Sequence, residues 1–178
     1  MDHPTPQVLR ELLRYEPETG KLFWLPRPRN MFRCDKDFRQ WNAKNANREA
    51  LTADTGRGYR RGRVLFQSVR AHRAIWAMQT GQWPEDVIDH INGNGMDNRW
   101  ANLRAASKSQ NSHNARRRTD NKTGVKGVTK IANAQKWRAE IRVGGRGKYL
   151  GVFNCVTAAA IAYARASAEL HGEFGRIA

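Results

Sequence analysis

Residues 87–114 of the chain read VIDHINGNGMDNRWANLRAASKSQNSHN, and this stretch joins a short apolar run to a polar loop. The run ends in the pair Asp89-His90. The loop at residues 93–98 is rich in Gly and Asn, which tight turns favour, so Asn98 is expected to serve the turn. We expect strand, loop, strand and helix, an order that can gather a base, a metal ligand and a structural amide into one small site.

The helix at the end of this stretch has a clear start. Ser107 and Gln110 match a capping box, and the helix is expected to continue to residue 116 or 118. Its basic end has two interpretations: cations placed against the helix C-terminus, or a phosphate clamp that leads into a polar linker at residues 119–123.

The residues before the stretch predict a β-hairpin and a helix. Residues 58–70 contain strand-forming side chains, with a turn expected at Gln67-Ser68. A helix is expected over residues 71–80, with Gly81 just past its end. Five arginines crowd onto the hairpin: Arg57, Arg60, Arg61, Arg63 and Arg70.

The N-terminal part carries weaker patterns. Apolar residues at helical spacing predict a helix over residues 6–15, and a strand is expected at 21–25. Residues 26–55 are polar with scattered aromatic side chains, which favours a loop with a short helix near residues 35–46.

After the linker, the sequence predicts three strands and a helix. Strands are expected at 125–129, 137–143 and 148–153, and a helix over 156–171. In the middle strand, apolar and charged residues alternate, so Arg138, Glu140 and Arg142 share one face. The residues thus indicate a small three-stranded antiparallel sheet packed on one helix, with one sheet face left free.

Charge is the strongest signal of the composition. The chain has 178 residues with 32 Lys and Arg against 16 Asp and Glu, a net charge of +16. Solubility alone would explain a smaller excess, so a nucleic-acid partner is expected. The chain has no run of 18 apolar residues and no signal-peptide layout, so an intracellular protein without membrane spans is expected. Cys34 and Cys155 are isolated, which argues against a disulfide framework or a cysteine-bound zinc.

Phosphodiester hydrolysis suits the side chains of residues 87–114. It needs an activated water, neutralisation of phosphate charge and help for the leaving oxygen. A histidine with a pKa near 6.5 can act as the base, and a divalent ion held by carboxylate and amide oxygens can supply the charge.

The motif DHINGNGMDNRWANLR followed by SQNSHN closely resembles the HNH nucleases with their ββα-metal site. The resemblance implies that His90 is the general base and Asp89 a metal ligand. It makes Asn102, twelve residues after His90 (102 − 90), the asparagine that holds the loop, and Asn111 the second metal ligand. His113 and Asn114 remain alternatives for that last position. The lead-in resembles the phage and intron-encoded branch, where His72 would be a support residue or a phosphate contact.

Residues 124–178, with the pieces WRAEIRV, YLGVF and AYARASAELHGEF, resemble the APETALA-type (ethylene-response-factor) DNA-binding domain. That resemblance implies a sheet that lies in the DNA major groove. The DNA-binding residues expected from the resemblance and from the basic helix end are Arg138, Glu140, Arg142, Lys126, Lys130, Arg146, Lys148, Tyr149, Arg116, Arg117 and Arg118.

Together these features predict an α+β protein with four parts: an N-terminal extension (1–56), an HNH nuclease unit (57–118), a linker (119–123) and a DNA-binding domain (124–178). We expect a phage or mobile-element homing endonuclease that acts in the host cytoplasm on double-stranded DNA. Its cofactor would be Mg²⁺ or Mn²⁺ rather than zinc, and it would work as a monomer or a homodimer. The alternatives are a DNA-binding regulator with a silent nuclease unit and an RNA-directed nuclease.

Overall fold

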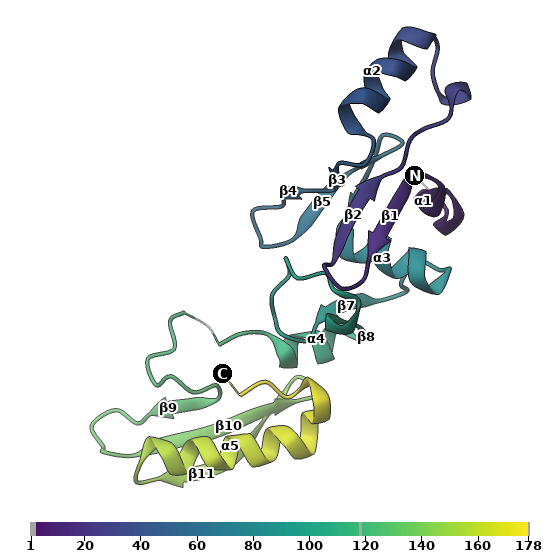
Figure 1. Ribbon diagram of the computed structural model, residues 1–178. Helices are drawn as coiled ribbons and strands as arrows, with labels where there is room; N and C mark the ends of the chain where they lie inside the picture. The colour runs from purple at the N-terminus through teal and green to yellow at the C-terminus, as the bar shows by residue number, and fades with distance from the viewer. Residues whose placement is uncertain (1–2, 118, 178) are drawn as a thin grey trace. The chain divides into compact units, whose positions relative to one another are not determined.

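The computed structural model describes residues 3–117 and 119–177, so the predicted contact residue Arg118 lies outside the described part. Contacts divide the chain into two compact units between Ala105 and Ala106, and each unit is described by itself. Over the described residues the chain forms five α-helices and several small sheets, most of them antiparallel (Figure 1). The predicted α+β class is confirmed, whereas the division into four predicted parts stays a prediction. No helix among these residues has the length and apolar character that a membrane crossing requires.

The first unit contains three small sheets and three α-helices. The sheets have the strand orders β1-β2-β3, β4-β5-β6 and β7-β8. The elements are α1 (Pro6–Leu12), β1 (Leu13–Glu16), β2 (Lys21–Trp24), η1 (Arg29–Met31), α2 (Asp35–Asn45), β3 (Glu49–Ala50), β4 (Ala53–Asp54), β5 (Arg60–Val64), β6 (Gln67–Arg70), α3 (Ala71–Thr80), β7 (Val87–His90), η2 (Trp100–Asn102) and β8 (Leu103–Ala106).

The first helix is shorter than its apolar spacing predicts. Thr5 caps it by accepting a hydrogen bond from the backbone of Val8, and it ends at Leu12. Leu13 already belongs to β1, where it pairs with Trp24. The prediction of a helix to residue 15 is therefore wrong, because cross-strand hydrogen bonds compensate the backbone better here than a further helical turn.

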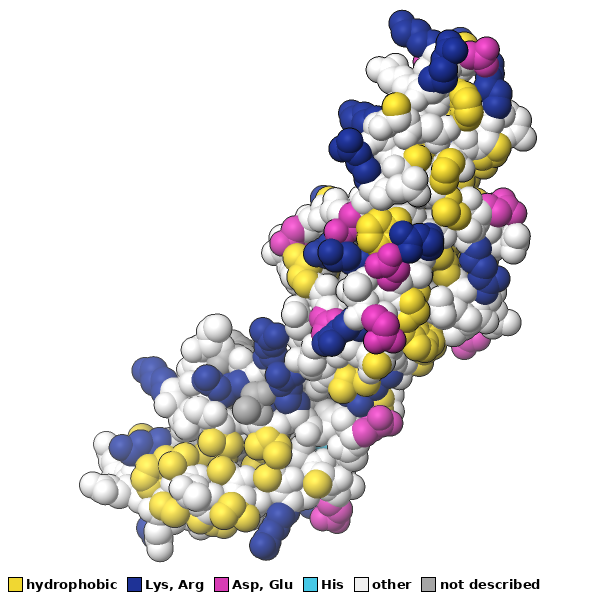
Figure 2. Space-filling model, viewed as in Figure 1, with side chains coloured by type: hydrophobic (Ala, Val, Ile, Leu, Met, Phe, Trp, Pro, Cys, Tyr) yellow, Lys and Arg dark blue, Asp and Glu magenta, His cyan; other side chains and the backbone are white. Residues whose placement is uncertain are grey.

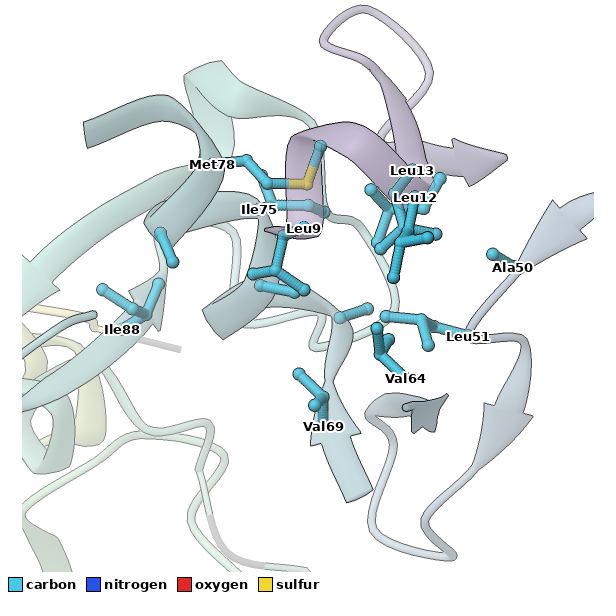
Figure 3. Close-up of a cluster of buried hydrophobic side chains, with 14 of the residues drawn as sticks. Leu9, Leu12, Leu13, Ala50, Leu51, Val64, Val69, Ile75, Met78 and Ile88 are labelled. Carbon is cyan, nitrogen blue, oxygen red and sulfur yellow. The ribbon is translucent and has the colours of Figure 1, made fainter. Parts of the chain in front are cut away.

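One apolar core holds the first unit together. Leu9 and Leu12 of α1, Val64 of β5 and Ile75 of α3 are fully buried in it. Figure 3 shows Val64 and Val69 pointing from one face of the β5–β6 hairpin toward this cluster. Burial of this face leaves the opposite face of the hairpin for solvent or a partner.

The β5–β6 hairpin turns two residues earlier than predicted. Val64 pairs with Gln67, so Leu65 and Phe66 form the turn and Gln67-Ser68 begins β6. Both turn residues have positive φ angles, 47° and 68°. Such turns favour Asn, Asp and Gly, which explains why the pair Leu-Phe looked like strand.

The second unit follows its prediction closely. It consists of α4 (Lys108–Asn114), β9 (Val128–Lys130), β10 (Trp137–Val143), β11 (Arg146–Phe153), α5 (Val156–His171) and η3 (Gly172–Phe174). The antiparallel sheet has the order β11-β10-β9, and α5 lies across it (Figure 1). Ala139 and Ile141 of β10 are buried with Tyr163 of α5. The Ser107–Gln110 capping box is confirmed, but α4 ends at Asn114 rather than at residue 116 or 118.

Candidate active site

Strand β7 ends in two buried titratable side chains. Asp89 and His90 are each only 4% exposed. The backbone N–H of Ile91 donates to the carbonyl of Asn102 at 2.9 Å, which joins the start of the polar loop to the η2 turn. The two side chains have different nearest neighbours.

The imidazole of His90 is held by one amide and two rings. Its Nε2 lies 3.1 Å from Oδ1 of Asn98. The ring of His72 meets it edge-on at a centroid distance of 5.1 Å, and Tyr59 lies at 5.8 Å. When Nε2 donates to this amide oxygen, a neutral ring has its lone pair on Nδ1.

Burial also sets the charge of His90. Desolvation lowers the pKa of the imidazole below its usual 6.5, although the Asn98 hydrogen bond and the charge of Asp89 act in the opposite direction. The ring is therefore neutral at neutral pH and able to accept a proton, as a general base must be.

Asn98 has a larger part in this site than the expected turn residue. Its side chain is 2% exposed, and its backbone carbonyl accepts a 2.8 Å hydrogen bond from the hydroxyl of Tyr15. The β1–β2 hairpin thus supports the residue that orients His90. Sequence reasoning missed this contact, because an Asn in a loop rich in Asn and Gly cannot be distinguished from an ordinary turn former.

Asn102 ties the two ends of the polar loop together. Its Oδ1 accepts from the backbone N–H of Asn92 at 2.9 Å, and its Nδ2 donates to the carbonyl of Asp97 at 2.7 Å. Asp97 in turn bonds Arg99, which lowers the pKa of the carboxyl to about 2. The loop between β7 and η2 is therefore closed by side chains as well as by backbone.

Asp89 forms a buried ion pair. Its Oδ2 accepts from Nε of Arg104 at 2.9 Å, and Nη2 of the same guanidinium also lies at 2.9 Å. Among the described residues no three His, Cys, Asp or Glu side chains gather into a metal-binding group. One carboxylate still fits Mg²⁺, an ion that commonly binds one or two carboxylates and takes its other ligands from substrate phosphates and water.

His72 is packed as a neutral ring. It is 4% exposed, and its Nδ1 is buried without a hydrogen-bond partner in the described structure. Desolvation, with the nearby charges of His90, Arg70 and Arg73, lowers its pKa to about 3. A ring in this state is unsuited to act as a cationic phosphate contact, and its place between Tyr59 and His90 is that of a support.

The predicted second metal ligand, Asn111, lies on α4 in the second unit and is half-buried. The two alternatives differ in their surroundings. The ring of His113 stacks on His171 at a centroid distance of 3.6 Å, whereas Asn114 is 5% exposed. The choice among the three residues stays a prediction.

The free face of the second sheet carries charged side chains, as the alternation predicts. Arg138 and Arg142 are exposed on β10, and Glu140 between them pairs with Arg138. Tyr149 is exposed and pairs with Glu140, so it lies on this face. Lys130, Arg146 and Lys148 are also exposed, but they pair with Trp137, Val143 and Ile141 of β10 and so lie on the opposite face. Together with Arg116 and Arg117, Arg138 and Arg142 line a cavity of about 800 Å³.

Lys126 makes contacts that its prediction as a DNA contact did not foresee. Its ammonium donates to the carbonyls of His113 and Ala115, each at 2.8 Å. These carbonyls lie at the end of α4, where a helix lacks intrahelical donors and favours cations. In the described structure Lys126 therefore caps α4.

Comparisons with known proteins agree with this geometry. Residues 69–113 match the family model described as HNH endonuclease, and this range includes His72, Asp89, His90, Asn98 and Asn102. Protein 3.8 of Escherichia phage T7 is 30% identical over 113 residues, which are 63% of this chain and 93% of Protein 3.8. No solved structure matches the chain. The predicted HNH resemblance is thus confirmed for a domain at residues 69–113, and the chain as a whole belongs to the family of Protein 3.8.

Proposed function

We propose that this protein is a divalent-metal-dependent DNA endonuclease of the homing type, in which His90 is the general base. The observation that carries the proposal is the state of His90. The ring is buried and neutral, it is oriented by Asn98, and it lies beside Asp89 within the segment that matches the HNH endonuclease model.

The chemistry follows from the proton positions on His90. Water attacks phosphorus, and Nδ1 of His90 takes the proton that the water oxygen loses. The bond between phosphorus and the leaving oxygen then breaks, and that oxygen gains a proton from solvent. A divalent ion bound to Asp89, with Asn111 as the further proposed ligand, would neutralise phosphate charge and stabilise the leaving oxygen.

Three neighbours keep the base in position. Asn98 fixes the tautomer, because rotation of the ring would lose its hydrogen bond. The rings of His72 and Tyr59 pack against His90 and limit its movement. Because its low pKa keeps His72 neutral, it places no positive charge beside His90 at 5.1 Å. His72 is therefore a positioning residue in this proposal.

The second unit is proposed as a DNA reader of the APETALA type. Arg138 and Arg142 supply exposed cations on a flat sheet face, and arginine can make bidentate contacts to guanine. A tethered reader raises the local concentration of a weakly binding catalytic unit. The phage origin of Protein 3.8 supports a phage or mobile-element setting.

A plasmid-nicking assay tests the catalytic assignment. In Mg²⁺, His90→Ala should lower the nicking rate by about 10³-fold or more, because removal of a positioned base costs this order of rate. EDTA should stop the wild type. DNA affinity measured by fluorescence anisotropy and far-UV circular dichroism should stay at wild-type values, so that a loss of folding is recognised.

The same assay separates the competing functions. A wild-type nicking rate of His90→Ala in Mg²⁺ would refute the mechanism. A wild type that binds duplex DNA in every metal but never cuts it would favour the DNA-binding regulator. Arg138→Ala combined with Arg142→Ala should weaken DNA binding about tenfold or more and flatten its salt dependence, and unchanged binding would refute the reader.

A further inference from the structure

The turn of the β5–β6 hairpin places the side chain of Phe66 where it gains almost nothing from packing. Phe66 is 94% exposed and Leu65 is 39% exposed. Both have positive φ angles, which bulky residues adopt only rarely. Local preference accounts for neither residue, and burial does not account for Phe66. Such unfavourable backbone conformations concentrate at functional sites.

The hairpin beneath this turn exposes one strongly basic face. Arg61, Arg63 and Arg70 share the face opposite to the buried Val64 and Val69, and Arg61 pairs directly with Arg70 across the strands. None of the three arginines forms an ion pair with a described Asp or Glu, although Arg60 on the other face pairs with Glu49. Like charges directly opposite each other destabilise a sheet, and a polyanion would relieve them.

A basic groove lies along this face. Its volume is about 720 Å³, and Arg57, Arg61, Arg70 and Arg73 line it. No described residue of its lining is Asp or Glu. Figure 2 shows dark-blue Lys and Arg side chains spread over the visible face of each unit, in agreement with the net charge of +16.

The base of the hairpin reaches His90 through one aromatic ring. The guanidinium of Arg70 lies 6.0 Å from the ring centroid of Tyr59, and Tyr59 lies 5.8 Å from His90. Phe66 is four residues from Arg70 along β6 (70 − 66), which corresponds to about 14 Å in a strand. The duplex rises about 3.4 Å per base pair, so the turn is about four base pairs from the Arg70 end.

We propose that the Leu65–Phe66 turn is a DNA wedge: Phe66 inserts between two base pairs of the duplex while Arg61 and Arg63 contact the adjacent phosphates. Exposed Phe and Leu side chains flanked by cations are the means by which proteins unstack and kink DNA. The wedge rests on the proposed function, because it requires duplex DNA as the substrate. It places a kink about four base pairs from the phosphates near Arg70.

The test measures DNA unwinding, which an inserted side chain causes and phosphate contacts alone do not. The full chain with His90→Ala is bound to a relaxed plasmid, a metal-independent topoisomerase is added, and the change in linking number is read on an agarose gel. Adding Phe66→Ala should reduce the change per bound protein about fivefold or more, whereas the dissociation constant should change less than about threefold. The exposed Ile161 of α5 gives a matched control, and Ile161→Ala should unwind as the parent does.

A second variant protects the test against a folding artefact. Leu65→Asn combined with Phe66→Gly installs the residues that this turn favours, so the melting temperature should rise by roughly 4 °C while unwinding is lost. Equal unwinding by this variant, or by Phe66→Ala, would overturn the wedge. So would a parent that binds DNA without unwinding it, a result that leaves the endonuclease proposal standing.

Two other results would also overturn the wedge. A parent protein that fails to bind duplex DNA in the anisotropy measurement would refute the proposed function and the wedge with it. Self-association that depends on Phe66 in sedimentation velocity, with unwinding unchanged in the variants, would identify the turn as a contact between copies of the chain.

Discussion

Replacement of His72 by Phe tests the claim that a buried neutral imidazole supports His90. The phenyl ring keeps contacts with Tyr59 and His90 but cannot take up a proton. At neutral pH the change removes a buried nitrogen that has no hydrogen-bond partner among the described residues, so the free energy of unfolding should change little. A difference in the free energy of unfolding between the wild type and His72→Phe should appear only at acidic pH.

The size of that difference follows from the pKa of His72. The folded value is about 3 and the unfolded value about 6.5, so below pH 6.5 only the unfolded chain binds this proton. The contribution of neutral His72 to the free energy of unfolding is therefore fully present above pH 6.5. It falls as the pH drops toward 3, by about 1.4 kcal/mol per pH unit. Between pH 7.5 and 5.0 the wild type should lose about 2 kcal/mol that His72→Phe retains.

Urea unfolding at pH 7.5 and 5.0, followed by tryptophan fluorescence, measures this difference. His90 titrates in both proteins, so its contribution cancels in the comparison. His72→Gln, which removes the titration but also the ring, should show the same smaller pH dependence. Parallel stability curves for the wild type and both variants would refute the neutral buried state of His72. Retained nicking by His72→Phe, within about tenfold of wild type, would further separate support from phosphate contact.

Two smaller changes test local packing. Gly95→Ala would place a methyl group against the backbone carbonyl oxygen of Gly58 and 2.7 Å from two ring carbons of Tyr59, so the first unit should lose about 1–3 kcal/mol in urea unfolding. Unchanged stability would mean that the segment with Gly58 and Tyr59 does not pack on this loop. Ser107→Ala removes the cap of α4 and should cost the second unit about 1 kcal/mol, measured by thermal circular dichroism, whereas an equal melting temperature would show that the capping box is not formed.

Local patterns in the sequence determined several elements correctly. The alternation along β10 predicted which side chains face α5, because successive strand residues point to opposite sides. Ser107 and Gln110 marked the start of α4, and Gly81 marked the end of α3 through its positive φ of 79°. The motif with Asp89 and His90 also identified the family, since it depends on residue types at fixed spacing.

The tertiary structure decided the features that depend on residues far apart in the chain. Leu13 leaves its helix because a partner strand offers it hydrogen bonds, which no helical pattern records. Asn98 orients His90 only because the β1–β2 hairpin and the polar loop fold against each other through Tyr15. The Leu65–Phe66 turn was missed for a related reason. Both residues favour a strand, and only the pairing of Val64 in β5 with Gln67 in β6 forces them into positive φ.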